Sequence, residues 1–569
     1  MHCDPASPKD NRQGSVFGAQ TKQRIGRPAG DHFGAASRRS GIERCSRPQQ
    51  EHPASACPDL ETVERRSMTW LKLWPWTRDA LAIGASLIAQ SLFVGAAFAQ
   101  QSTPNILFIL ADNIGYGDIG AYGGGELRGS PTPRIDQLAA EGLRLTQFLV
   151  EPSCTPSRAA LMTGRYSIRS GLSLVAVAGT SISLPADEIT MAEMLRDAGY
   201  ATAIFGKWHL GGQIYSQPQN QGFDEFYGIP PSDTWDAFGM IRQGLQTKSV
   251  DISLENGPHI VEAKRGEPLT LVKPYTEEVR RGIDWELVDH GIDFMTRQKA
   301  AGKAFFLYLP ISRTHFPNLP SKRFEGASRI GQFGDSLMEG DAIVGTVLDA
   351  LKALGLEENT IVVFASDNGP DGPGASRFGA DMPDMGTTGP YRGALGDVSE
   401  GAIRTAAVIR WPQMIKPRSS YAMFSIMDFF PTFARLAGGK VPSDRPIDGI
   451  DQSDLLLGKN DTGRREHLLT FVGSDLVSVR WKQFRAYFVD VGPGRSGPGG
   501  MMPMGGVGSS AAPMNGYPKV FNVESDPQEE HNIGEMYNWV LGPLLKAVEE
   551  YKTTLVRSPN PPGANMTKF

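Results

Sequence analysis

The chain has 569 residues, enough for two domains or for one large α/β domain with an appendage. Hydrophobic residues make up 40% and charged residues 21%, which is typical of a soluble globular protein and not of a disordered one. The formal net charge of −5 is mild for this length and argues against nucleic acid as a partner, because such binding needs a basic face.

The N-terminal part differs from the rest of the chain. Residues 1–67 are rich in Arg, Ser, Pro, Gly and Gln, so we expect disorder there, or a start-site artefact if translation begins at Met68. Residues 68–99 combine basic residues, an apolar run and the triplet Ala97-Phe98-Ala99, which is typical of a secretory signal peptide. An N-terminal membrane anchor is the alternative. The signal peptide predicts a periplasmic or secreted protein, with no stable membrane partner after cleavage.

The cysteines are few, and one of them stands apart. Cys3, Cys45 and Cys57 precede the signal peptide, so an exported chain keeps only Cys154 and forms no internal disulfide. A lone cysteine is either a small buried hydrophobe or a functional group. The residues that flank Cys154 favour the functional interpretation.

Alternating strands and helices are predicted after the signal peptide. Short continuous apolar runs predict buried strands at residues 105–111, 201–205, 305–309 and 360–366. Helical patterns lie between them at residues 189–198 and 340–354. This order predicts an α/β fold with a mainly parallel sheet flanked by helices. Two strands end in the polar pairs Asp112-Asn113 and Asp367-Asn368, and ligands bind at the carboxyl ends of such strands.

We expect two structural units. A large catalytic domain is predicted over residues 102–455, followed by a small C-terminal α+β subdomain over residues 456–569. Residues 492–516 are dominated by Gly, Pro, Met and Ser, which predicts a loop. A plain surface insertion is favoured for this loop over a lid on an apolar substrate.

The segment Ser153-Cys-Thr-Pro-Ser-Arg-Ala-Ala-Leu-Met-Thr-Gly-Arg165 resembles the signature of the type I sulfatases, in the alkaline phosphatase-like superfamily. In that family a separate formylglycine-generating enzyme oxidises the cysteine to formylglycine. The resemblance implies that Cys154 acts in this form: one hydroxyl of its hydrate attacks sulfur, and the other expels sulfate by collapse to the aldehyde. It also implies that Arg158 holds the hydrate and the metal region electrostatically.

The resemblance runs from about residue 105 to about residue 533 and includes both polar pairs. It implies a divalent cation bound by Asp112, Asn113, Cys154, Asp367 and Asn368. Hard oxygen ligands favour Ca²⁺, with Mg²⁺ as the alternative. Such an ion would lower the pKa of the nucleophile and neutralise charge on the sulfate.

Two further segments match the family in its catalytic part. Gly206-Lys207-Trp208-His209 implies that Lys207 contacts the sulfate and that His209 acts on a proton of the hydrate. Thr314-His315 matches a second histidine that contacts the sulfate near the leaving oxygen and helps to protonate it. Residues 520–532 resemble the closing segment of the family, in its small C-terminal subdomain.

The sequence departs from the family pattern at two positions. The first metal pair is usually Asp-Asp, so Asn113 leaves two carboxylates where three are expected and predicts weaker retention of the cation. Leu395 stands where a lysine usually contacts the sulfate and the leaving group. Arg377 and Arg392 are candidates to replace its charge.

These features together predict arylsulfatase-like hydrolysis of a small-molecule or glycan sulfate ester. Two alternatives remain open. One is a phosphodiester or phosphonate monoester hydrolase of the same superfamily, since related folds host different chemistries. The other is a catalytically impaired protein that binds sulfated ligands, which the departures at Asn113 and Leu395 favour.

Overall fold

The computed structural model describes residues 103–176, 181–230, 258–371, 386–491, 511–513 and 516–562. The predicted disorder over residues 1–67, the predicted signal peptide and Arg377 lie outside the described residues, as does most of the predicted loop over residues 492–516. Among the helices of the described ranges, none combines the length and the apolar character that crossing a bilayer requires.

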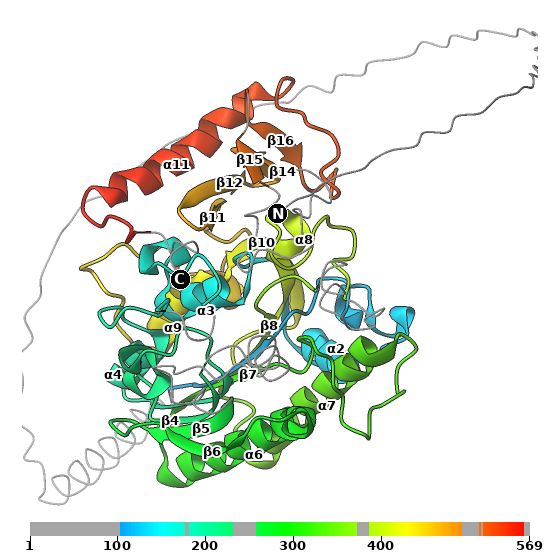
Figure 1. The fold of residues 1–569 in the computed structure, drawn as a ribbon, viewed down its shortest axis with the longest axis vertical. Helices are drawn as coiled ribbons and strands as arrows, with labels where there is room; N and C mark the ends of the chain where they lie inside the picture. The colour runs from blue at the N-terminus through cyan, green and yellow to red at the C-terminus, as the bar shows by residue number, and fades with distance from the viewer. Residues whose placement is uncertain are drawn as a thin grey trace, which may run out of the picture. The chain divides into compact units, whose positions relative to one another are not determined.

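A ten-stranded mixed sheet forms the centre of the fold, in the order β10-β2-β9-β8-β1-β7-β3-β4-β5-β6 (Figure 1). Its strands are β1 (Asn105–Ala111), β2 (Leu143–Leu149), β3 (Ala201–Lys207), β4 (Glu225–Ile229), β5 (His259–Lys264), β6 (Thr270–Pro274), β7 (Phe305–Ile311), β8 (Thr360–Ser366), β9 (Arg404–Arg410) and β10 (Arg418–Ser425). The run β8-β1-β7-β3-β4 is parallel throughout, whereas β9, β5 and β6 pair antiparallel with their neighbours. The predicted α/β fold with a mainly parallel sheet is confirmed.

Helices cover both faces of this sheet. The side chains of β1 alternate between the faces, because successive residues of a strand point in opposite directions. Leu107 and Ile109 pack against α2 (Pro133–Glu141), α6 (Glu277–Ala301) and α7 (Gly331–Ala353). Phe108 and Leu110 belong to the core under α3 (Cys154–Thr163), α4 (Met191–Asp197) and α9 (Phe429–Ala437). A strand buried on both faces explains the continuous apolar run in the sequence.

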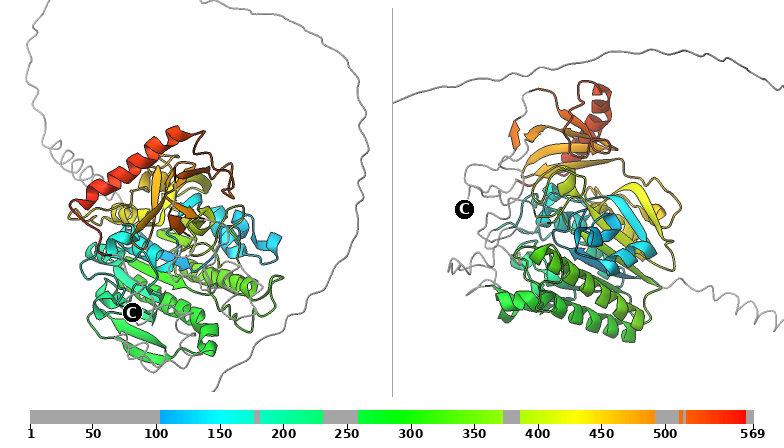
Figure 2. Two further views of the ribbon diagram at one scale, coloured as in Figure 1. Left: turned by 45° about the horizontal axis from the view of Figure 1, so that its top comes forward. Right: turned by 90° about the vertical axis from the view of Figure 1, so that its right-hand side faces the viewer.

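The second sheet is built from residues beyond 455. It has four antiparallel strands, β11 (His467–Val472), β12 (Asp475–Trp481), β13 (Phe484–Tyr487) and β16 (Lys519–Asn522). Figure 2 shows α11 (Leu541–Leu555) beside these strands. The short strands β14 (Val489–Val491) and β15 (Ala511–Pro513) pair with each other at the two ends of the predicted loop. The domain boundary at residue 455 stays a prediction.

The remaining helices are short. They are α8 (Glu400–Ile403), α10 (Ser453–Leu456) and the 3-10 turns η1 (Gly120–Tyr122), η2 (Gly125–Arg128), η3 (Ser167–Ser170), η4 (Ile214–Ser216), η5 (Pro218–Asn220), η8 (Ile426–Asp428) and η9 (Asn538–Val540).

The register of β1 places the functional segments at one edge of the sheet. Ala111, the last residue of β1, lies opposite Ser366 of β8 and Ile311 of β7. The Asp367 backbone N–H donates to the Ala111 carbonyl oxygen at 3.1 Å. The two polar pairs that follow β1 and β8 are therefore neighbours, although more than 250 residues separate them.

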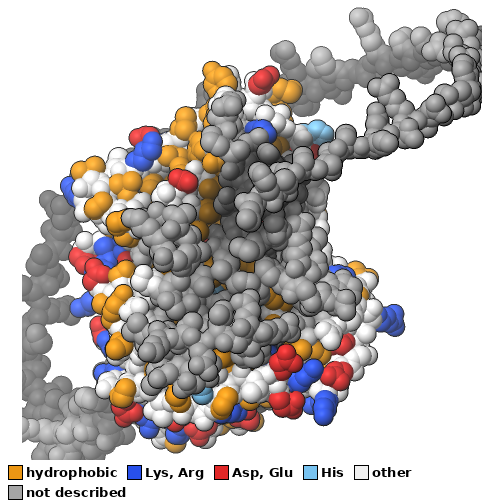
Figure 3. Space-filling view, in the orientation of Figure 1, with side chains coloured by type: hydrophobic (Ala, Val, Ile, Leu, Met, Phe, Trp, Pro, Cys, Tyr) orange, Lys and Arg blue, Asp and Glu red, His pale blue; other side chains and the backbone are white. Residues whose placement is uncertain are grey.

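Charged groups on the surface are mixed. On the face shown in Figure 3, basic and acidic side chains alternate over α6 and α7. Arg297 of α6 pairs with Glu225 at 2.8 Å and with Asp293 at 2.7 Å. Exposed pairs of this kind contribute little to stability.

A buried ion cluster connects the two sheets. Glu400, at the start of α8, accepts hydrogen bonds from Arg480 and, at 2.7 Å, from Arg485. Arg404 and Arg480 each also donate to Glu524 at 3.0 Å. Burial opposes ionisation of Glu400, but the three arginines outweigh it and lower its pKa to about 2. The second sheet is thus held to α8 by charge as well as by apolar packing.

Replacing Glu400 should destabilise the protein strongly. Glu400→Gln removes the carboxylate that Arg485 contacts and one of the two that Arg404 and Arg480 contact, and it should lower the free energy of unfolding by ~3–5 kcal/mol, measured by urea denaturation. The folded-state pKa of Glu400 is depressed, so its contribution is present above pH 4.5 and fades as pH falls toward 2. The difference in the free energy of unfolding between the native protein and Glu400→Gln should therefore decrease as the pH falls from 4.5 toward 2. Glu549→Gln, which removes an exposed pair with Lys552, is the control and should change stability by ~0–1 kcal/mol.

Candidate active site

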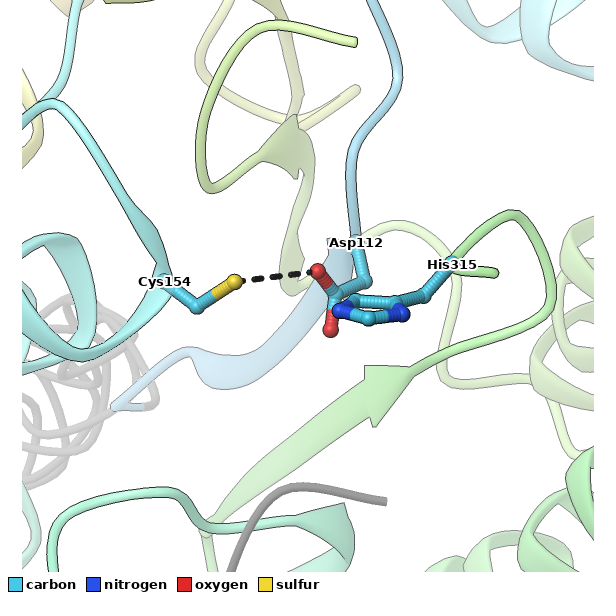
Figure 4. A group of neighbouring side chains, drawn as sticks. All are labelled: Asp112, Cys154 and His315. Atoms are coloured by element: carbon cyan, nitrogen blue, oxygen red, sulfur yellow. Dashed lines mark hydrogen bonds between the residues drawn. The ribbon is translucent and has the colours of Figure 1, made fainter. Parts of the chain in front are cut away.

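Cys154 is the first residue of α3 and faces the first polar pair. Its Sγ lies 3.4 Å from Asp112 Oδ1 and 3.8 Å from Asn113 Oδ1 (Figure 4). Burial, followed by the charge of Asp112, raises the pKa of the Cys154 thiol well above its usual value. The side chain is therefore a neutral thiol, and a neutral thiol is a poor nucleophile.

The residues that follow Cys154 fix the start of α3 to its surroundings. The Thr155 hydroxyl donates to the His209 carbonyl oxygen at 3.0 Å and accepts from the Ala176 backbone N–H at 3.0 Å. The Ser157 hydroxyl bonds to the backbone N–H and carbonyl of Glu151 at 3.0 and 3.1 Å. These contacts position residue 154, which explains why small hydroxyl side chains stand at these places in the signature.

Arg158 connects the two strand ends. Its Nε and Nη2 donate to Asp367 Oδ2 at 3.0 and 2.8 Å, and Nη2 also donates to Asp112 Oδ2 at 3.2 Å. Nη1 donates to the Lys207 carbonyl oxygen at 2.9 Å. The planar guanidinium thus holds β1, β8 and the end of β3 at one point, which a single ammonium does not reproduce.

Lys207 is the second buried cation. Its Nζ donates to Asp112 Oδ2 at 2.6 Å. Burial on its own raises the pKa of Asp112, but Lys207, His315 and Arg158 outweigh this effect and hold it well below its usual range. Burial and then the charge of Asp112 raise the pKa of Asp367 to about 6. The cations around Asp112 therefore hold it as a carboxylate, whereas Asp367 ionises less readily.

Strand β3 passes close to β7 just before the chain reaches His209. Gly206 has φ 139°, and a Cβ there would lie 2.2 Å from the Pro310 carbonyl oxygen, so only glycine fits. Both ring nitrogens of the buried His209 lack a hydrogen-bond partner within the described ranges. Burial, together with Lys207 and Arg158, keeps the pKa of His209 well below its usual value, so its ring is neutral.

His315 completes the cluster from the segment after β7. One ligand atom each of Asp112, Cys154 and His315 lies within 4.8 Å of the others, and Figure 4 shows His315 beside the Asp112 carboxylate. The Thr314 hydroxyl donates to the Asp112 carbonyl oxygen at 2.6 Å, and His315 Nδ1 lies 2.7 Å from the Phe316 carbonyl oxygen. The His315 segment is therefore tied directly to the end of β1.

The polar pairs present the oxygens that a hard cation prefers. Asn368 Nδ2 donates to Asn113 Oδ1 at 2.6 Å, while the buried Asn368 Oδ1 has no partner among the described residues. Asn113 Nδ2 donates to Asp371 Oδ1 at 2.9 Å. A buried amide oxygen without a partner there, together with the buried carboxyl groups of Asp112 and Asp367, fits a divalent cation with oxygen ligands.

Asp371 lies in the site, although the family motifs do not include it. It lies four positions after Asp367 on the same loop and is only 4% exposed. Burial and the charge of Asp112 raise its pKa to about 8. In the sequence, Asp371 is visible as a third acidic residue just after the second polar pair. The sequence does not show which residue its side chain contacts.

The second departure from the family pattern lies on a neighbouring segment. The backbone N–H of the half-buried Leu395 donates to the Pro370 carbonyl oxygen at 2.8 Å, beside the loop of the second polar pair. The Arg392 backbone N–H donates to the Pro527 carbonyl oxygen at 3.0 Å. Leu395 thus borders the loop that carries Asp367 and Asp371.

Comparisons with known proteins decide the family. Residues 104–439 match the family model described as Sulfatase. The chain belongs to the sulfatase family. Bovine (Bos taurus) arylsulfatase A is 36% identical over 485 residues, which cover 81% of this chain and 89% of that protein. Rat (Rattus norvegicus) steryl-sulfatase is 31% identical, over 86% of this chain and 94% of its own.

A solved structure agrees with these relatives. The PsFucS1 sulfatase from Pseudoalteromonas sp. superposes with a TM-score of 0.72 at 32% identity, covering 84% of this chain and 95% of that structure. The predicted family is confirmed, and the protein is an enzyme of the sulfuric ester hydrolase class. The structure brings all the predicted site residues to one edge of the sheet: Asp112, Asn113, Cys154, Arg158, Lys207, His209, His315, Asp367 and Asn368. Their individual roles stay predictions.

Arg158→Lys should impair this sulfatase although the charge is kept. A lysine ammonium cannot contact Asp367, Asp112 and the Lys207 carbonyl in the same geometry, so kcat/KM for an aryl sulfate should fall by about 100-fold. Arg165→Lys is the matched control, because Arg165 is also buried near α3 but pairs with Glu188, outside the cluster. Equal losses in the two variants would show that the Arg158 network has no special role.

Proposed function

We propose that this sulfatase hydrolyses sulfate esters with a formylglycine made from Cys154, assisted by a divalent cation. The observation that carries the proposal is the environment of Cys154, whose thiol is buried, neutral and directed at Asp112. A neutral thiol is poorly suited to attack, whereas hydrated formylglycine would supply a hydroxyl nucleophile. Maturation would require a formylglycine-generating enzyme as a partner.

The cation of this proposal would be Ca²⁺, with Mg²⁺ as the alternative. The residues that would hold it are Asp112, Asn113, residue 154, Asp367 and Asn368. Bound there, it would lower the pKa of the nucleophile and neutralise charge on the sulfate. The orphaned Asn368 oxygen and the buried carboxylates support this set of ligands.

The protein's own cations and histidines have complementary tasks in this proposal. Lys207 and Arg158 provide fixed positive charge beside residue 154, where a sulfate ester anion would bind. His209 is neutral, and neither of its ring nitrogens has a partner in the described part of the chain, so it would act on a proton of the hydrated nucleophile. His315, on the other side of Asp112, would contact the sulfate and donate a proton to the leaving oxygen.

The state of residue 154 tests the mechanism directly. We expect formylglycine at this position when the chain is co-expressed with a maturase, detected by peptide mass spectrometry and an aldehyde-reactive probe. Cys154→Ala should abolish turnover while keeping the unfolding temperature, because the lost group is chemical and small. Turnover by a chain whose residue 154 is an unmodified thiol would refute the formylglycine mechanism.

A substrate panel separates sulfate hydrolysis from its alternatives. Arylsulfatase A and steryl-sulfatase, by their names, act on aryl and steryl sulfates, which supports a small-molecule or glycan sulfate ester here. The chain would be assayed with an aryl sulfate, a phosphate diester and a phosphonate monoester of the same leaving group. Preference for the sulfate supports the proposal, preference for either phosphorus ester favours the hydrolase alternative, and binding without turnover favours the impaired protein.

The features of residues 68–99 support a periplasmic or secreted location.

Leu395 points to a preference among sulfate esters. If no cation assists the leaving oxygen from this position, esters with poor leaving groups should suffer most, because an aryl oxygen carries negative charge better than an alkyl or sugar oxygen. A half-buried leucine can also pack against an apolar leaving group. We therefore propose that activated aryl sulfates are the preferred class.

A leaving-group series would test this preference. We expect kcat/KM of the native enzyme to fall steeply as the pKa of the leaving alcohol rises. Leu395→Lys should flatten that slope and raise the turnover of alkyl sulfates by about tenfold, since a cation then stabilises the leaving oxygen. Leu395→Met keeps the apolar character and serves as control. Identical slopes for all three proteins would show that another group already supplies the charge.

A further inference from the structure

The Asn113 amide is held at both of its ends. Its Oδ1 accepts from Asn368 Nδ2 at 2.6 Å and lies 3.8 Å from Cys154 Sγ, whereas its Nδ2 donates to Asp371 Oδ1 at 2.9 Å. An amide whose nitrogen is tied to a carboxylate must turn its oxygen the other way. The oxygen of Asn113 therefore faces the Asp112 and Cys154 side of the cluster, where the cation of the proposed function would lie.

Asp371 is itself fixed next to the site. It is buried on the loop that carries Asp367, and it places a third acidic group beside the neutral Asn113 amide. Arg158 and Lys207 pair with Asp112 and Asp367. The Asp371 carboxyl group is thus placed to hold the Asn113 amide.

We propose that Asp371 is a positioning residue of the metal site: it holds the Asn113 amide so that the amide oxygen can act as a ligand in place of the missing carboxylate. The proposal rests on the proposed function, because it assumes a divalent cation at this cluster. The Asn113–Asp371 pair then acts as one unit. A hydrogen bond from the amide N–H to the Asp371 carboxyl oxygen increases the negative charge on the amide oxygen, in the same way that outer carboxylates strengthen metal-binding histidines.

A charge-swap experiment tests the pairing. Ca²⁺ affinity would be measured by calorimetry on purified native chain, Asp371→Asn, and the double variant Asn113→Asp/Asp371→Asn, with the state of residue 154 matched by mass spectrometry. We expect Asp371→Asn to weaken Ca²⁺ binding by about 10- to 100-fold. The double variant moves the carboxylate to position 113 and should recover at least about tenfold of that loss, because the two positions are coupled.

Asp341→Asn is the matched control. Asp341 is also a buried acid, but it accepts from the backbone N–H groups of Arg134 and Ile135 at the start of α2. This variant should change stability and leave Ca²⁺ affinity unaltered. If Asp371→Asn does not fold, the double variant Asn113→Asp/Asp371→Asn still tests the proposal. The proposal requires this double variant to fold and to bind Ca²⁺.

The outcomes separate this inference from the function on which it rests. A native chain that binds neither Ca²⁺ nor Mg²⁺ overturns the cation itself. A native chain that binds Ca²⁺ while Asp371→Asn binds it equally well overturns only the role of Asp371. A double variant no better than Asp371→Asn also overturns it, since a merely structural Asp371 would not be rescued by moving its charge.

Discussion

The burial of Asp112 is the constraint on which the rest of the site depends. A carboxylate without solvent contact is strongly unfavourable unless cations and hydrogen bonds compensate it. Lys207 supplies one cation from the end of β3, and Arg158 supplies another from α3. Each cation is itself buried, so its position must be fixed by the backbone around it. The Arg158 contact with the Lys207 carbonyl shows how the two are made interdependent.

Strands β1, β3, β7 and β8 could be predicted because they are buried on both faces and carry continuous apolar runs, whereas β9 is equally buried but begins and ends with arginine. The apolar runs give β1 and β8 with the bounds that the structure has, and they give β3 and β7 to within two residues. The edge strand β6 was not predicted, since its residues are mostly exposed and carry no apolar run. The 25-residue helix α6 was not predicted either, because its core face includes the buried Arg280 and Asp284, which break the apolar pattern.

In the site, too, residues in short motifs could be predicted from the sequence, whereas contacts between distant segments could not. Cys154, Lys207 and their flanking residues lie in short segments whose sequence alone matches a family. Asp371 contacts Asn113 across 258 residues of chain, and nothing in either segment specifies that contact. The register of β1 and β8 creates it, by placing the two loops side by side. Long-range register was the quantity that sequence patterns could not supply.

The C-terminal closing segment is also connected to the site through a chain of hydrogen bonds. Glu529 accepts from the Glu400 backbone N–H at 2.8 Å, and Pro527 accepts from that of Arg392 at 3.0 Å. The segment that contains Arg392 and Glu400 then reaches the loop of Asp367 and Asp371 through the bond from Leu395 to Pro370. The family pattern in residues 520–532 therefore does more than complete the small sheet. It holds the segment bearing Leu395 against that loop, so in the proposed function a disturbance far from Cys154 would reach the residues that border the leaving group.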